Sequence, residues 1–160
     1  MSDVSVYYRA RRMANFALFT IDLQLNRLTR DELEDRNFIL RRWADFHFFI
    51  LALVKIRRAG LLARKLPSIK SKIDNALKEF DLKLPYLITM RNVDQHFEDY
   101  AVDEGWNKNI SRQSLEVGMY DNQVYNWLGF EVDIQKAFKA SKEFFQVIKE
   151  SEHQAISSKV

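Results

Sequence analysis

The stretch from Phe38 to Val54 constrains the fold of this chain more than any other. Between Trp43 and Val54 its only strongly polar residues are Asp45 and His47, so a helix here would be apolar on nearly all sides. Such a helix has to be buried by other elements. It is too short to span a bilayer, which takes about 20 apolar residues. We therefore expect a central core helix with the apolar residues Phe38, Ile39, Leu40, Trp43, Phe46, Phe48, Phe49, Ile50, Leu51, Leu53 and Val54.

Few residues elsewhere interrupt helices, because the chain has only 4 glycines and 2 prolines in 160 residues. Apolar residues at helical spacing predict helices over residues 4–27, from 29 to between 60 and 66, over 69–80 and 86–102, and from 134 to about 150. The prediction is an all-α fold, a bundle of about five helices. A chain of this length suits one domain over residues 1–160, and the polar residues 151–160 should fray.

Residues that favour helix starts support these boundaries. Thr29 and Glu32 have the spacing of a capping box, and Ser68 and Asp133 are well placed as N-caps. Pro85 suits the first turn of a helix, where its missing amide costs nothing.

A β-hairpin is expected before the last helix, over about residues 114–130. The strand-like segments 115–120 and 123–128 flank Asp121-Asn122, a pair that tolerates the positive φ angles of a tight turn. Alternation would place Tyr120, Tyr125 and Trp127 on one face, and we expect that aromatic face to be available to a partner. The other face, with Leu115, Val117, Met119, Val124 and Leu128, would pack on the bundle.

Composition excludes some classes of site and leaves others open. The chain has no cysteine, so thiolate nucleophiles, disulfides and cysteine-ligated metals are impossible. No apolar run reaches membrane-spanning length and no signal-peptide pattern opens the chain, so we expect a cytoplasmic protein without a membrane partner.

The net charge of +3 is compatible with an RNA partner. The densest basic region is Lys55, Arg57, Arg58, Arg64, Lys65, Lys70 and Lys72, which is either a solvated surface or a nucleic-acid contact.

One motif points to chemistry. Arg91, Asn92 and His96 form the pattern Arg-Asn-x-x-x-His in a predicted helix. This pattern resembles the signature of the HEPN superfamily, small helical bundles that often form dimers. The resemblance implies a metal-independent endoribonuclease of the toxin or phage-defence kind, with no cofactor. It implies His96 as acid and base, Arg91 as the group that stabilises phosphate charge, and Asn92 as a positioning residue.

The proposed chemistry suits these side chains. A histidine can move a proton between the 2′-hydroxyl and the leaving 5′-oxygen, and a guanidinium can offset charge on the phosphate. Two features need an explanation, however. On one straight helix Arg91 and His96 would point about 140° apart, and the acidic residues Asp94, Glu98, Asp99, Asp103 and Glu104 would repel RNA.

Other interpretations of the motif remain open. In the structural one, Arg91 pairs with neighbouring acids and His96 flanks the core. In another, the chain is a non-catalytic interaction module that binds a partner through its acidic and aromatic surfaces. A homodimer would cover Ile88, which points away from the predicted core stripe of its helix, and could complete a site from two copies. His47, His96 and His153 are not expected to converge on a metal.

Overall fold

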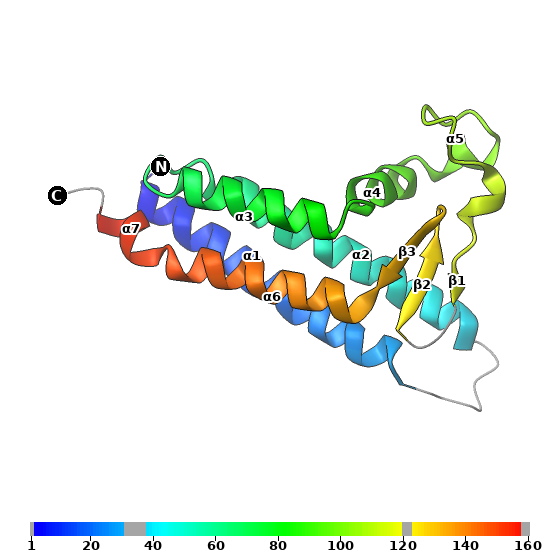
Figure 1. Ribbon diagram of the computed structural model, residues 1–160, viewed down its shortest axis with the longest axis horizontal. Coiled ribbons are helices and arrows are strands. Elements are labelled where there is room, and N and C mark those ends of the chain that lie inside the picture. The colour runs from blue at the N-terminus through cyan, green and yellow to red at the C-terminus, as the bar shows by residue number, and fades with distance from the viewer. Residues whose placement is uncertain (1, 31–37, 120–122, 158–160) are drawn as a thin grey trace.

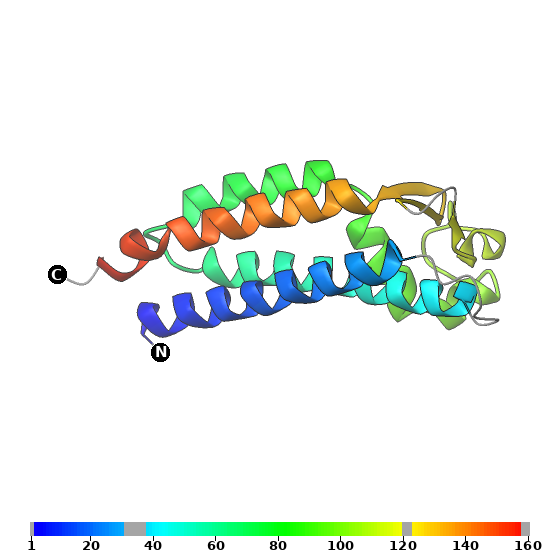
Figure 2. The same cartoon turned by 90° about the horizontal axis from the view of Figure 1, so that it is seen from below.

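The computed structural model describes residues 2–30, 38–119 and 123–157. Four helices build its body: α1 (Asp3–Leu28), α2 (Phe38–Ala63), α3 (Lys70–Lys83) and α6 (Ile134–Glu150). Figure 2 shows them as two layers, with α1 and α2 in one layer and α3 and α6 in the other. The apolar faces of both layers are buried in one continuous core.

Shorter elements complete the two ends of the bundle. At one end lie α4 (Leu87–Gln95), α5 (Phe97–Ala101), the 3-10 turn η1 (Arg112–Leu115) and a three-stranded sheet (Figure 1). At the other end α7 (Glu152–Ile156) packs beside the start of α1. The predicted helical bundle with a hairpin before the last long helix is confirmed, and α1, α2, α3, α4 and α6 match the five predicted helices. Within the described ranges, none of the helices combines the length and apolar character needed to cross a membrane.

The predicted central helix is buried on one broad side only. Phe46, Phe49 and Leu53 of α2 are fully buried, as expected. By contrast, Leu40 is 63% exposed and Phe48 is 56% exposed. At Phe48 and Leu51, α1 and α4 flank α2 without closing over its outer surface. The side chains of Phe38 and Ile39 lie outside what the structure describes. An apolar face of α2 therefore remains open.

The helix predicted over residues 86–102 is broken at His96. There the backbone has φ −129° and ψ 35°, α4 ends at Gln95, and α5 starts at Phe97. The break shifts the helical phase, so Phe97 is 44% exposed although a continuous helix would have buried it. Tyr100 is buried as predicted, and Ala101 is exposed. The straight-helix angle between Arg91 and His96 therefore does not apply.

The predicted hairpin is present, and a third strand extends it. Strands β1 (Gly118–Met119) and β2 (Val124–Trp127) are antiparallel, with Met119 opposite Tyr125. The predicted turn at Asp121-Asn122 lies outside the described residues. Strand β3 (Phe130–Asp133) then pairs with β2, with Tyr125 opposite Val132. Leu128 and Gly129 join these two strands with φ angles of 54° and 78°, as in a tight type I′ turn.

The aromatic face of the hairpin packs inward, so the predicted partner surface is wrong. Tyr125 stacks on Phe46 with ring centroids 4.9 Å apart, and Trp127 is fully buried. The indole Nε1 of Trp127 donates a hydrogen bond to the carbonyl of Leu115 at 2.9 Å. Val117 and Leu128 of the predicted aliphatic face are buried as well, so residues from both predicted faces contribute to the core. Tyr120 lies outside the described residues.

Helix ends agree with the predictions in part. Asp133 caps α6 by accepting a hydrogen bond from the amide of Lys136 at 2.9 Å. Ser68 does not cap α3, because the N-cap residue is Ile69 and no side chain bonds there. Thr29 is the C-cap of α1, and its hydroxyl donates to the carbonyl of Leu25; its predicted partner Glu32 lies outside the described residues.

The predicted frayed tail is helical through residue 156. Ala155 and Ser151 are buried, because α7 packs beside the start of α1. Ser151 also donates a hydrogen bond to the carbonyl of Val147 at 2.7 Å. The segment is therefore part of the fold, and residues 158–160 lie outside the described part.

Candidate functional site

Helix α4 carries the motif and presents one side of it to a groove. Ile88, Arg91 and Gln95 recur at the spacing that puts side chains on one helix face. Arg91 Nη1 donates a hydrogen bond to Gln95 Oε1 at 3.0 Å, one turn later on that face. Val93 and Met90 point the other way, into the core. Arg91 and Gln95 therefore line the groove from the α4 side.

The groove crosses the open surface of α2 between α1 and α4 and encloses about 440 Å³. Its described lining has three cationic side chains and no carboxylate. Aromatic and aliphatic groups make up most of the rest, and Lys55 Nζ lies 5.4 Å above the ring of Phe16. The lining residues are Phe16, Thr20, Phe48, Leu51, Ala52, Val54, Lys55, Arg58, Arg91 and Gln95. Such a groove suits an anion that also has apolar or aromatic surface.

Arg91 has no carboxylate partner among the residues that the structure describes. Its Nε is buried without a hydrogen-bond partner, and its one side-chain bond goes to the neutral amide of Gln95. The interpretation in which Arg91 pairs with neighbouring acids is therefore wrong. A guanidinium without a counter-charge keeps its full capacity to bind an anion.

His96 lies just past the end of α4, one residue beyond Gln95. Its side chain is 55% exposed, so it does not flank the core. Its Nδ1 is 3.9 Å from Asp99 Oδ2, and it is not among the residues that line the groove. Within residues 38–119 no hydrogen bond or ion pair joins it to Arg91. Asn92 is half-buried on α4 and is also outside the lining.

Four of the acidic residues near the motif lie beyond the helix break. Glu98 and Asp99 belong to α5, and Asp103 and Glu104 follow it, so all four lie beyond His96. Asp103 has a positive φ of 62° in the turn after α5. None of the four lines the groove. Direct contact between these four carboxylates and a strand in the groove is therefore not expected.

Asp94 has a partner that the motif did not predict. Its Oδ1 is 3.3 Å from Nδ1 of His47 on α2, and both side chains are about one-third exposed. The His47 ring meets Trp127 edge-on, with centroids 4.7 Å apart. This contact joins the motif helix, the central helix and the sheet. In the sequence, Asp94 stands out as an acid inside the motif and His47 as a histidine among aromatic residues. Only the fold shows that these two side chains contact each other.

Other ion pairs connect the helices away from this groove. Arg57 donates two hydrogen bonds to Asp81, at 2.7 and 2.8 Å, and this contact raises the pKa of the guanidinium. The Lys83 ammonium lowers the pKa of the Glu143 carboxyl, joining α3 to α6. Part of the predicted basic region is thus paired with acids, whereas Lys55 and Arg58 line the groove.

The structure defines a class of architecture: two layers of paired helices closed at one end by a small antiparallel sheet, with a basic groove beside the motif helix. Comparisons with protein-family models, with curated proteins and with solved structures give no match. Across the described ranges, no three histidine, aspartate or glutamate side chains gather as potential metal ligands.

Proposed function

We propose that this protein is a HEPN-like, metal-independent endoribonuclease that works as a homodimer. The observation that carries the proposal is the setting of Arg91. The motif arginine enters a groove with Lys55 and Arg58, and no described carboxylate neutralises it there. Phosphates of an RNA strand would find three cations in this groove, and bases would find apolar surface.

The chemistry follows from the side chains of the motif. His96, which is open to solvent, takes the proton from a ribose 2′-hydroxyl or delivers one to the leaving 5′-oxygen. Arg91 stabilises the charge that builds on the pentacoordinate phosphate. Asn92 positions the strand or the imidazole. Attack by the 2′-oxygen breaks the phosphorus–5′-oxygen bond and leaves a 2′,3′-cyclic phosphate.

The proposed dimer pairs the open face of α2 with that of a second copy along one edge of the groove, so that the groove stays open to RNA between the two copies. Phe48 and Leu51 are 56% and 40% exposed, and Ile88 of α4 is 36% exposed beside the same groove. Large exposed apolar side chains that lie together on a helix pair are typical of an interaction surface. In the proposed dimer, Arg91 of one copy and His96 of the other form the shared site, since the two side chains do not contact each other within one chain.

Wild-type protein should cleave single-stranded RNA in the presence of EDTA. The reason is that the proposed acid, base and charge stabiliser are all side chains of the protein. The products should carry 2′,3′-cyclic phosphate ends, which mass spectrometry of short fragments detects. Activity that disappears in EDTA and returns with a divalent metal would contradict the proposal.

In light scattering, wild-type protein should have about twice the 19.0 kDa mass of one chain. Phe48→Glu should convert it to monomer, because a carboxylate would be buried in the proposed interface without a partner. Leu82→Glu is the matched control, since Leu82 is 70% exposed on α3, away from that face. A wild-type monomer would remove both the dimer and the shared site.

A second candidate function is a non-catalytic interaction module, which the same apolar face favours. In that case the groove would take a segment of a protein partner. Absence of RNA cleavage together with a monomeric wild-type protein would favour this function over the ribonuclease.

A further inference from the structure

A second basic hollow lies on another side of the molecule, between α1 and α6. These helices run antiparallel, since the hydroxyl of Tyr7 near the start of α1 bonds the carbonyl of Ile148 near the end of α6 at 3.0 Å (Figures 1 and 2). The hollow encloses about 490 Å³. Its lining is Tyr8, Arg11, Arg12, Asn15, Phe145 and Lys149. We call this surface the α1–α6 seam.

Two cations of the seam are available for a ligand. Arg11 forms an ion pair with Glu152 of α7, so its charge is already compensated. Arg12 and Lys149 have no carboxylate partner among the described residues, and both are exposed. The seam therefore has a local excess of positive charge from two helices that face one another.

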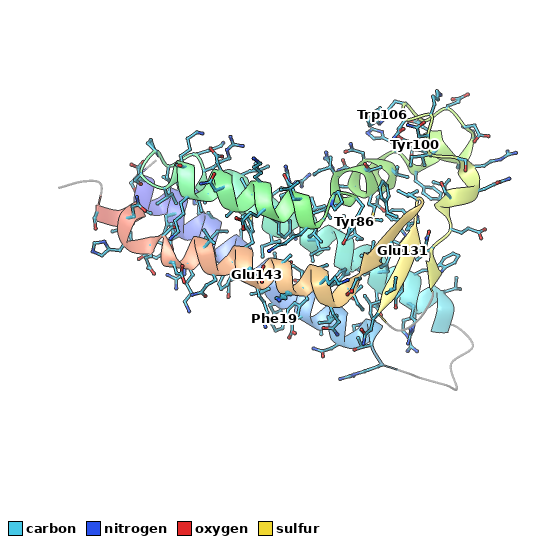
Figure 3. The ribbon with its side chains drawn as sticks, viewed as in Figure 1. Phe19, Tyr86, Tyr100, Trp106, Glu131 and Glu143 are labelled. Carbon is cyan, nitrogen blue, oxygen red and sulfur yellow. The ribbon has the colours of Figure 1, made fainter. Side chains whose placement is uncertain are left out.

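Aromatic rings alternate with these cations. Tyr8 is 47% exposed, and its hydroxyl donates a hydrogen bond to Glu152 Oε1 at 3.2 Å, which fixes the ring at the rim. Phe145 is half-buried in the wall. Further along, Lys142 Nζ lies 5.1 Å above the ring of Phe138. Figure 3 places Phe19, which is 66% exposed, at the edge where α1 runs alongside α6.

We propose that the α1–α6 seam binds a single-stranded polynucleotide. Exposed rings let bases stack whatever their sequence, and cations between the rings follow the phosphates. The Asn15 side chain adds a donor and an acceptor for base edges. Tyr8 to Phe19 spans about 16 Å of helix, which matches about five stacked nucleotides at about 3.4 Å each. The inference that the bound strand is an RNA substrate rests on the proposed function. The inference that the seam binds a strand is argued from the contacts of the seam alone.

The test measures binding separately from cleavage. The probe is a fluorescent oligouridine with 2′-O-methyl groups, which lacks the nucleophile for strand scission, and the readout is anisotropy over a range of salt concentrations. Wild-type protein should bind it. Arg12→Ala/Lys149→Ala should reduce the slope of log affinity against log salt by about 1.4, because each lost phosphate contact contributes about 0.7. Lys72→Ala/Lys78→Ala removes the same charge from exposed positions on α3 and should leave most of the affinity and slope unchanged.

Stacking is tested with a second pair of variants. Tyr8→Ala should weaken binding by about 5- to 150-fold, the range for loss of one base–aromatic stack. Tyr8→Phe keeps the ring without the hydroxyl and should recover most of the affinity.

No binding by wild-type protein, or equal losses in the seam and α3 variants, would overturn the inference. Displacement of the strand by uridine monophosphate at equal nucleotide concentration would overturn the assignment to a polynucleotide. Binding at the seam without any cleavage of unmodified RNA would instead overturn the ribonuclease and leave this inference standing.

Discussion

His96→Ala should lower the rate of RNA cleavage by about 10²- to 10⁴-fold, the usual contribution of a general acid or base. The substitution removes the only imidazole of the motif. It should leave the fold intact, because the His96 side chain is 55% exposed and lies at the junction of α4 and α5. Initial rates on a labelled single-stranded RNA, together with circular dichroism of both proteins, measure the two effects.

His153→Ala is the matched control for this prediction. His153 is exposed on α7, at the opposite end of the bundle from the motif (Figure 1). Its loss should leave the rate within about twofold, since it is outside both the groove and the motif. Cleavage by His96→Ala protein at the wild-type rate would show that another group transfers the proton, and the motif assignment would fail.

Phe46→Ala should lower the free energy of unfolding by about 3–5 kcal/mol, through lost burial and the cavity left behind. The ring is fully buried, stacks on Tyr125 at 4.9 Å, and meets Trp127 edge-on at 6.2 Å. Its removal would loosen the contact between α2 and the sheet. Urea unfolding followed by circular dichroism, at one protein concentration for all variants, gives the difference.

A pair of leucine substitutions tests whether loss of buried surface causes this decrease in stability. Leu53→Ala should cost about 2–5 kcal/mol, because Leu53 is fully buried, whereas Leu82→Ala should stay within about 0.5 kcal/mol at 70% exposure. Similar small losses at Phe46, Leu53 and Leu82 would mean that the core lies elsewhere.

Much of the helical framework was predictable from local sequence. The scarcity of glycine and proline and the periodic apolar residues predicted all five principal helices, and Asp133 was recognised as a cap. These features act within a few residues along the chain, so the sequence alone carries them. The spacing of Arg91, Asn92 and His96 in the sequence likewise predicted the candidate site, and that assignment stays a prediction.

Features that depend on the phase of a helix, or on contacts with residues distant in the sequence, were not predictable in the same way. The break at His96 turned Phe97 outward, although the helical period predicted burial. The positive φ of Leu128 allowed a third strand at a position where leucine rarely forms a turn. Burial of Tyr125 and Trp127 was decided by the ring of Phe46, which comes from a distant part of the chain.

In the candidate site, too, some features follow from the sequence and others only from the tertiary structure. The sequence by itself determined which side chains are available: an arginine, an asparagine and a histidine within six residues, in a chain without cysteine. Only the tertiary structure decided that Arg91 meets Lys55 and Arg58 in a groove without acids, while Asp94 turns to His47. The physical reason is that helical periodicity specifies the face on which a side chain lies, whereas its neighbours are set by packing between helices far apart in the sequence.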